Sequence, residues 1–260
     1  MIGKRLEIDN VFCKQKGVAM KAILMAAGRG TRISRMIEEV PKSTLPINGV
    51  PLIAHTVKML KKLGFDVVVC VGYRQQLIRD ALKDYEVKYY FNPFYEISNS
   101  IGSLWLAREE LTGEAIMMNA DVYFSEDILQ MLLDDPRDAV LLADKTRCAT
   151  GDYFFSTTDT GAIRKYGKDL PLNARSSEYV GIAKVSKGFM PVFTERLNKL
   201  MNESQHQLWW ENTLYSLTDD TEHQIYTKDV EGKFWSEVDF FDDYLRILNH
   251  LEQMKEKPEG

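Results

Sequence analysis

The chain has 260 residues, of which 45% are hydrophobic and 27% charged, and its formal net charge is −5. This composition provides enough apolar residues for the core of one α/β unit, and the acidic balance argues against nonspecific binding to nucleic acid. No apolar run is long enough to span a membrane, and residues 1–19 lack the continuous apolar core of a signal peptide. We therefore expect a cytoplasmic protein with no membrane or nucleic-acid partner.

The first half of the chain alternates predicted strands and helices. Strands are expected at residues 22–25, 67–71, 87–91, 115–118 and 139–143. Helices are expected at residues 52–63, 75–82, 103–111 and 126–133. This alternation predicts an α/β fold with a doubly wound, mostly parallel sheet, which binds ligands at the carboxyl ends of its strands.

The second half is less regular, and the sheet is expected to be mixed there. Strands are expected at residues 153–157, 162–166, 179–185 and 234–238. Helices are expected at residues 190–201, at 209–217 and from the last strand to about 254. Because no repeat or low-complexity linker interrupts the chain, we expect one domain over residues 20–254 with a small inserted subregion, preceded by an N-terminal extension over residues 1–19.

A glycine turn follows the first predicted strand, in the segment KAILMAAGRGTRISRMIEEVPKSTLP. Small residues at Gly28 and Gly30 let backbone N–H groups approach a phosphate, and Arg32 and Lys42 add two cations that would hold a polyphosphate. A dinucleotide fingerprint would need a third glycine where Ile33 stands, and a Walker loop would need Gly-Lys before Ser or Thr. The segment therefore favours a nucleoside triphosphate site over these loops or an ordinary turn.

The segments AILMAAGRGTR and VPKSTLPINGVPLIAHTVKML resemble the N-terminal signature of the sugar-nucleotide and choline-phosphate nucleotidyltransferases. The resemblance continues through NPFYEISNSIGSLWLA and NADVYF and returns at SEYVGIAKVS and SEVDFFDDY. It covers the chain from Met20 to about residue 250 and favours the compact choline-phosphate cytidylyltransferases. It implies a Rossmann-like nucleotidyltransferase fold, with a nucleotide-binding half at about 20–145 and an acceptor-binding half at about 146–254.

The activity implied is the magnesium-dependent transfer of CMP from CTP to a small phosphorylated amino alcohol such as phosphocholine, with release of pyrophosphate. The phosphate of such an acceptor is already anionic near neutral pH, so the reaction needs positioning and charge neutralisation rather than a protein nucleophile. Aminoethylphosphonate, phosphoethanolamine or a sugar 1-phosphate stay open as acceptors, as does UTP in place of CTP. A catalytically silent nucleotide-binding protein is an alternative from another class.

The resemblance assigns the catalytic roles to Lys42, Arg32 and Asp121, and the magnesium ligands to Asp121 and Asp239. Magnesium favours one or two carboxylates together with phosphate oxygens, which agrees with two separated aspartates. Each aspartate has a structural alternative, because Asp121 and Asp239 would also suit the caps of the helices that follow them. Lys42 would otherwise be a solvated surface lysine. The four histidines form no cluster, so a zinc site is not expected.

The remaining site predictions concern the two substrates. The nucleotide-binding residues are predicted to be Ala26, Ala27, Gly28, Gly30, Thr31, Gly72, Asn99 and Ser103. The acceptor-binding residues are predicted to be Lys145, Tyr153, Glu178, Trp210 and Glu211, with Arg147 and Trp209 as neighbouring candidates. Aromatic faces would suit a quaternary ammonium, whereas the two glutamates would suit a primary one. Packing in the core or at a subunit interface is the alternative for the tryptophans, and the sequence leaves open whether the protein is a homodimer.

Overall fold

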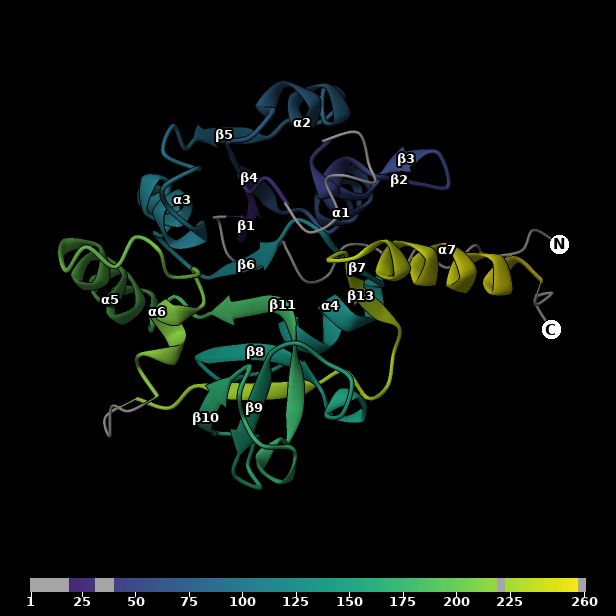
Figure 1. The fold of residues 1–260 in the computed structure, drawn as a ribbon. Helices are drawn as coiled ribbons and strands as arrows, with labels where there is room; N and C mark the ends of the chain where they lie inside the picture. The colour runs from purple at the N-terminus through teal and green to yellow at the C-terminus, as the bar shows by residue number, and fades with distance from the viewer. Residues whose placement is uncertain (1–18, 31–39, 219–222, 257–260) are drawn as a thin grey trace, which may run out of the picture.

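The computed structural model describes residues 19–30, 40–218 and 223–256 (Figure 1). Most of the predicted N-terminal extension, together with Thr31 and Arg32, lies outside the described residues. Among the described residues, no helix has the length and apolar character needed to cross a bilayer.

Nine strands of the described residues form one mixed sheet. Four neighbouring strands of it run parallel: β5 (Lys88–Phe91), β4 (Asp66–Val71), β1 (Lys21–Ala26) and β6 (Ala115–Asn119), in that order. The central strands read as continuous apolar runs such as VVVCV, as expected for strands covered on both faces. The carboxyl ends of these strands therefore lie along one edge of the sheet.

The long strand β11 (Ser177–Val185) pairs antiparallel with β6 and continues the sheet into the second half of the chain. It also pairs with β8 (Ala139–Asp144) and β9 (Phe154–Thr157). Two further strands complete the sheet: β10 (Ile163–Gly167) beside β9, and β12 (Tyr226–Asp229) beside β8. The mixed, mostly parallel sheet confirms the predicted fold class. Strand β12 was not predicted, because it is short and carries the polar residues of an edge.

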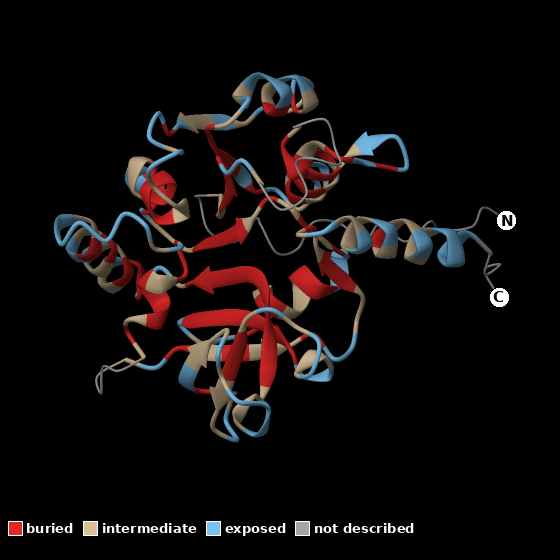
Figure 2. Cartoon of the chain, viewed as in Figure 1, coloured by how far each residue is buried: buried red, intermediate tan, exposed pale blue. Residues whose placement is uncertain are grey.

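Helices cover both faces of the sheet, and neighbouring residues of one strand reach opposite cores. Ile23 of β1 belongs to the core under α3 (Ser100–Leu106), α5 (Met190–Asn202) and α6 (Asn212–Tyr215). Leu24 belongs to the core under α1 (Leu52–Lys62), α2 (Gln75–Ala81) and α4 (Glu126–Leu133). Figure 2 shows the buried strands between these helices. The alternation follows from the period of two along a strand and makes the fold doubly wound.

Smaller elements surround the edge at which the parallel strands end. Two short pairs form beside it: β2 (Pro46–Ile47) with β3 (Val50–Pro51), and β7 (Val122–Phe124) with β13 (Trp235–Glu237). The C-terminal helix α7 (Phe241–Glu256) packs its apolar side on Leu45, Ile47 and Leu52. Single turns of 3-10 helix lie at η1 (Lys42–Thr44), η2 (Arg108–Glu110), η3 (Lys145–Arg147) and η4 (Leu172–Ala174).

Two predicted helices differ from the observed ones. Helix α3 begins at Ser100 rather than Ser103, because the Asn99 side chain accepts a bond from the Ser100 N–H at 2.8 Å and caps the helix there. The helix predicted over residues 209–217 is reduced to α6. The backbone N–H groups of Trp209 and Trp210 donate to the side chains of Asn212 and Ser100 instead, at 3.0 and 2.9 Å, so the helical turn starts after them.

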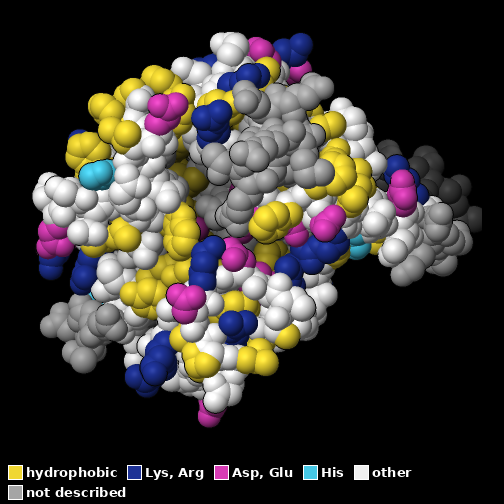
Figure 3. Space-filling model, in the orientation of Figure 1, with side chains coloured by type: hydrophobic (Ala, Val, Ile, Leu, Met, Phe, Trp, Pro, Cys, Tyr) yellow, Lys and Arg dark blue, Asp and Glu magenta, His cyan; other side chains and the backbone are white. Residues whose placement is uncertain are grey.

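Charges of both signs are interspersed on the face shown in Figure 3, where Lys and Arg side chains lie beside Asp and Glu side chains and among hydrophobic ones. The net charge of −5 is therefore not gathered into one patch on this face.

Candidate active site

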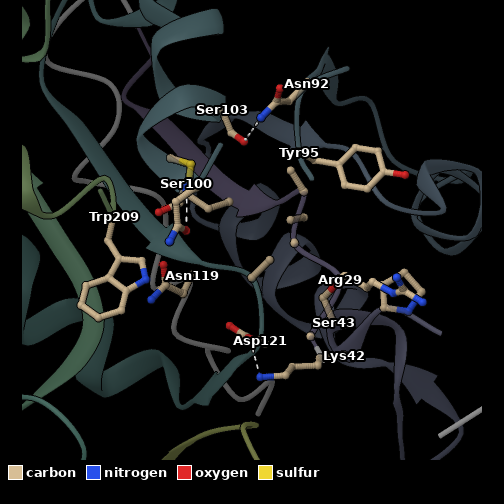
Figure 4. A pocket seen from close by; sticks show the side chains of 18 of the residues that line it. Arg29, Lys42, Ser43, Asn92, Tyr95, Ser100, Ser103, Asn119, Asp121 and Trp209 are labelled. Atoms are coloured by element: carbon tan, nitrogen blue, oxygen red, sulfur yellow. Dashed lines mark hydrogen bonds and ion pairs between the residues drawn. The ribbon is translucent and has the colours of Figure 1, made fainter. Parts of the chain in front are cut away.

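A cavity of about 380 Å³ opens at the carboxyl ends of β1 and β6 (Figure 4). Its walls come from the glycine turn, the loop before α3, the end of β6 and the segment after β13. The lining includes Met25, Ala26, Ala27, Gly28, Arg29, Gly30, Pro41, Lys42, Ser43, Asn92, Tyr95, Ser98, Asn99, Ser100, Ser103, Asn119, Ala120, Asp121, Trp209, Glu237 and Asp239. Most of the predicted nucleotide-binding, catalytic and metal-binding residues that the structure describes are thus brought to one cavity.

Close packing explains glycine at two positions, Gly30 within the glycine turn and Gly72 behind it. Gly30 has φ +63°, and a Cβ there would lie 2.8 Å from the Cγ of Lys42. Gly72 does not line the cavity but supports it, since a Cβ there would lie 2.7 Å from the carbonyl oxygen of Ala27. Gly28 has open space beside its Cα. The turn therefore leaves room on its cavity side for a phosphate.

Hydrogen-bonded polar side chains form the wall opposite the glycine turn. Asn92 donates from Nδ2 to Ser98 Oγ at 3.0 Å and to Ser103 Oγ at 2.9 Å. Asn99 caps α3 and also lines the cavity, so the capping role leaves its predicted role in nucleotide binding open. Tyr95 places an aromatic side chain beside these residues. Such a wall offers oxygens and amides to a nucleobase edge.

Lys42 is the central cation of the cavity. Its Nζ lies 2.5 Å from Asp239 Oδ1 and 3.7 Å from Asp121 Oδ2. Burial opposes the charge of this ammonium, but the carboxylates of Asp121, Asp239 and Glu237 outweigh burial and raise the pKa of Lys42 above its ordinary value. Lys42 is only 9% exposed and pairs with two carboxylates, which excludes the interpretation as a solvated surface lysine.

The start of the last helix is capped by the side chain of Asp243. The carboxylate of Asp243 accepts from the backbone N–H of Asp239 at 3.1 Å and of Phe240 at 2.8 Å, and so caps the start of α7. The Val238 N–H donates to the carbonyl oxygen of Asp121 at 3.0 Å and ties the two aspartate segments together. The side chain of Asp239 is thus directed to Lys42, in keeping with the predicted role.

Glu237 is a cavity residue that the sequence interpretation missed. Burial and the neighbouring charges of Asp121 and Asp239 raise the pKa of its carboxyl well above the ordinary range. A signal was present, because side chains at positions i and i+2 of an extended chain share a face, and SEVD places Glu237 two residues before Asp239. Asn119 was missed as well, although it directly precedes the Ala120–Asp121 pair.

The aspartates fit a magnesium ion in donor type. In the described part of the chain, no three His, Cys, Asp or Glu side chains are grouped so that they alone could hold a metal ion. Asp121 and Asp239 nevertheless converge on the same ammonium, and carboxylates completed by phosphate oxygens are what magnesium prefers. The pair, with Glu237 beside it, therefore fits a metal that is bound together with a nucleotide.

The structure separates the two adjacent tryptophans. Trp209 is 39% exposed and lines the cavity, whereas Trp210 is fully buried and donates from Nε1 to Asn119 Oδ1 at 2.9 Å. Tyr153 lies behind Trp209, with ring centroids 5.7 Å apart. Of these three predicted aromatic candidates, Trp209 alone faces the cavity. Trp210 instead orients Asn119, which lines the cavity.

The charged acceptor candidates are not among the residues that line the cavity. The side chain of Lys145 is 64% exposed and lies 3.9 Å from Asp229. Glu178 is buried and pairs with Arg147 at 2.7 Å, and burial raises the pKa of its carboxyl to about 7. Glu211 is buried directly behind Asn119, and burial raises its pKa to about 7 as well.

Residues 22–216 match the MobA-like NTP transferase domain family. The chain belongs to this family. The match covers well over half of the chain and includes the glycine turn, Lys42 and Asp121. The enzyme is therefore a nucleotidyltransferase, which confirms the reaction class that the N-terminal signature implies.

Curated relatives include cytidylyltransferases. The choline-phosphate cytidylyltransferase of Streptococcus pneumoniae is 26% identical, over 88% of this chain and 96% of its own length. The 2-aminoethylphosphonate cytidylyltransferase of Lancefieldella rimae is 27% identical over 74% of this chain and 78% of its own. A solved structure of the CTP:phosphocholine cytidylyltransferase of S. pneumoniae superposes with a TM-score of 0.73 at 24% identity, over 90% of this chain and 100% of its own, which bears on the fold alone.

Proposed function

We propose that this nucleotidyltransferase is a magnesium-dependent cytidylyltransferase, which transfers CMP from CTP to a small phosphorylated or phosphonylated amino alcohol and releases pyrophosphate. The observation that carries the proposal is the cavity in which the glycine turn, Lys42 and two aspartates meet beside Trp209 and Asn119. One end of this cavity suits a nucleoside triphosphate. The other end is acidic and aromatic, as a cationic acceptor requires.

The choice of CTP is supported by two features. The wall of Asn92, Ser98, Asn99 and Ser103 is built from small polar side chains fixed by hydrogen bonds, as hydrogen-bonded recognition of a pyrimidine edge requires. The relatives that match most of this chain include two named as cytidylyltransferases.

In the proposed reaction, an oxygen of the acceptor's phosphate or phosphonate attacks the α-phosphorus of CTP. A new P–O bond forms while the bond between the α-phosphorus and the bridging oxygen breaks, and pyrophosphate takes the electron pair. The backbone of Ala27 and Gly28 holds the phosphates closely, and the Lys42 ammonium neutralises charge that develops on them. No protein nucleophile is needed, because the acceptor is already an anion.

Asp121 and Asp239 would hold the magnesium ion, with Glu237 next to them. When bound, magnesium would act as a Lewis acid and neutralise charge on the phosphate oxygens. Because both aspartates contact Lys42, the same carboxylates also keep the lysine charged and directed toward the cavity.

The proposal is tested by measuring pyrophosphate release with each of the four nucleoside triphosphates against several acceptors: phosphocholine, phosphoethanolamine, 2-aminoethylphosphonate and hexose 1-phosphates. We expect turnover with CTP and at least one amino-bearing acceptor, and its loss when magnesium is chelated. Turnover with a hexose 1-phosphate alone would contradict the acceptor class while leaving the reaction class in place.

A further inference from the structure

A buried carboxylate lies directly behind the wall at the acceptor end of the cavity. Asn119 ends strand β6 and lines the cavity near Trp209 (Figure 4). Its Nδ2 donates to Glu211 Oε1 at 3.2 Å, and Glu211 is only 5% exposed. One amide side chain therefore separates this carboxylate from the space in which an acceptor would lie.

The orientation of the Asn119 amide is determined by Trp210. The indole Nε1–H can only donate, and it lies 2.9 Å from Asn119 Oδ1, so that atom must be the carbonyl oxygen. The amide nitrogen then faces Glu211, and it also lies 3.4 Å from Glu237 Oε1. Asn119 thus gives two glutamates one neutral donor group. Its contact with Glu237 is the longer of the two.

Glu211 lacks a cationic partner in the part of the chain that the structure describes. Lys42, which lines the cavity, is engaged by Asp121 and Asp239 instead. A buried carboxylate without a cation is costly, so such groups normally pair with one or bind a proton. The consequence is visible in the pKa of Glu211, which burial raises to about 7. A ligand that brings its own cation would supply the missing partner.

Within residues 19–30, 40–218 and 223–256, the nearby aromatic rings do not form a cage around this space. Tyr215 stacks with Tyr153 and with Tyr166, at centroid distances of 5.3 and 4.9 Å, so these rings pack on one another. Trp209 lines the cavity, and Lys168 Nζ already lies 5.3 Å from its ring. A quaternary ammonium has no N–H and depends on several aromatic faces, whereas a primary ammonium needs oxygen acceptors for its three N–H groups. The acceptor end supplies the oxygens.

We propose that Glu211, held in place by Asn119, determines acceptor specificity and selects a phosphate or phosphonate whose amino group carries N–H donors over one with a quaternary ammonium. Asn119 stays in place, and the ammonium enters beside its amide and donates to Glu237 and Glu211, so that a charged donor is added to the neutral one. This inference rests on the proposed function, because it assumes that the acceptor lies at this end of the cavity.

The test compares kcat/KM for phosphoethanolamine, 2-aminoethylphosphonate and phosphocholine at saturating CTP and magnesium. We expect the wild-type enzyme to prefer the primary amines by at least about tenfold, equivalent to about 1.4 kcal/mol. Glu211→Gln should raise KM for both primary amines by about tenfold and leave KM for CTP and for phosphocholine within about twofold. Glu211→Asp, which keeps the charge, should recover part of the preference.

Glu110→Gln is the matched control. Glu110 is also a buried glutamate, but it pairs with Lys21 and Lys88 at 2.7 and 2.5 Å, at the amino ends of β1 and β5. Its substitution should leave the acceptor order unchanged. Thermal unfolding of each variant verifies that it is folded. If Glu211→Gln does not fold, the ratios of kcat/KM between acceptors in the wild type and in Glu211→Asp test the inference.

Two outcomes would overturn the inference while the proposed function stands: a wild-type preference for phosphocholine, or an equal loss across all acceptors in Glu211→Gln. Turnover of a hexose 1-phosphate with none of the amino acceptors would overturn the proposed function itself, and this inference with it.

Discussion

Lys42 and Asp239 are 197 positions apart in the chain, yet Lys42 Nζ lies 2.5 Å from Asp239 Oδ1. The contact joins the segment after the glycine turn to the segment after β13, and Asp121 at the end of β6 completes the group at 3.7 Å. The lysine in the nucleotide half and the carboxylates that would hold a metal are thus parts of one charged centre. A change at any of the three is expected to affect the other two.

Replacement of Lys42 by methionine removes the charge and keeps most of the side-chain volume. We expect kcat/KM to fall roughly a hundredfold or more, because the developing charge on the phosphates loses its fixed cation. Steady-state pyrophosphate release measures this effect. Asp121 and Asp239 also lose a buried partner, so thermal unfolding without magnesium should occur at a lower temperature.

Lys62→Met is the control for this substitution, because Lys62 is exposed and pairs with Glu126 on the surface. It should leave kcat/KM unchanged within about twofold. Equal activity of the Lys42→Met enzyme and the wild type would show that Lys42 is not part of the reaction centre.

Asparagine at position 121 or 239 keeps the shape of the side chain and removes its charge. We expect each substitution to raise the magnesium concentration needed for half-maximal rate by at least about tenfold. Magnesium titrations at saturating CTP measure the shift. Asp127→Asn, at a surface carboxylate that pairs with Lys233, serves as the comparison. An unchanged magnesium requirement in both site variants would place the metal elsewhere.

Gly72→Ala should damage the nucleotide end of the cavity. The new Cβ would lie 2.7 Å from the carbonyl oxygen of Ala27 and 2.8 Å from the Cβ of Tyr95, so the turn must shift. We expect a loss of about 1–3 kcal/mol in the free energy of unfolding and a higher KM for CTP. Gly113→Ala, where a Cβ has open space, should change neither quantity. Equal free energies of unfolding and equal KM values for CTP in the two variants would argue against tight packing behind the turn.

The buried carboxyl of Glu178 makes stability depend on pH. Burial raises its pKa in the folded state to about 7, above the ordinary value of 4.5, despite the opposing charge of Arg147. Between these values the folded state retains a proton that the unfolded state has lost, so stability falls as pH rises from about 4.5 to 7. Urea unfolding at pH 5 and pH 8 should show Glu178→Gln losing less stability over this range than the wild type.

The control for the pH experiment is Glu126→Gln, because Glu126 is exposed and pairs with Lys62 on the surface. Its stability should follow the wild-type pH dependence. Parallel pH profiles for Glu178→Gln and the wild type would mean that Glu178 is already ionised in the folded protein.

The glycine turn was predictable because small residues mark a turn that can approach a phosphate. Lys42, Asp121 and Asp239 were grouped by the resemblance to the nucleotidyltransferases, since nothing in their spacing along the chain shows that they meet. The choice between Trp209 and Trp210 was not predictable from the sequence. Which indole faces the cavity depends on the Ser100 and Asn119 side chains, which lie far away in the chain and hydrogen-bond to Trp210.

The second half was harder to predict for a related reason. Strand β12 is short and polar, and it is stabilised by pairing with β8 rather than by an apolar pattern of its own. Glu178 and Glu211 were expected at the acceptor, but the sequence does not show how deeply β11 and the start of α6 are buried. Burial puts Glu178 against Arg147 and places Glu211 behind Asn119.

Transfer of CMP to an amino-bearing acceptor is recognised by the product that it forms. The enzyme is incubated with CTP, magnesium and phosphoethanolamine, and the mixture is followed by ³¹P NMR and mass spectrometry. The proposed function predicts equal amounts of pyrophosphate and of a CMP-linked phosphoethanolamine joined through a new phosphoanhydride bond. Intact CTP in the presence of phosphoethanolamine, phosphocholine and 2-aminoethylphosphonate, with a sugar nucleotide formed from a hexose 1-phosphate, would contradict it.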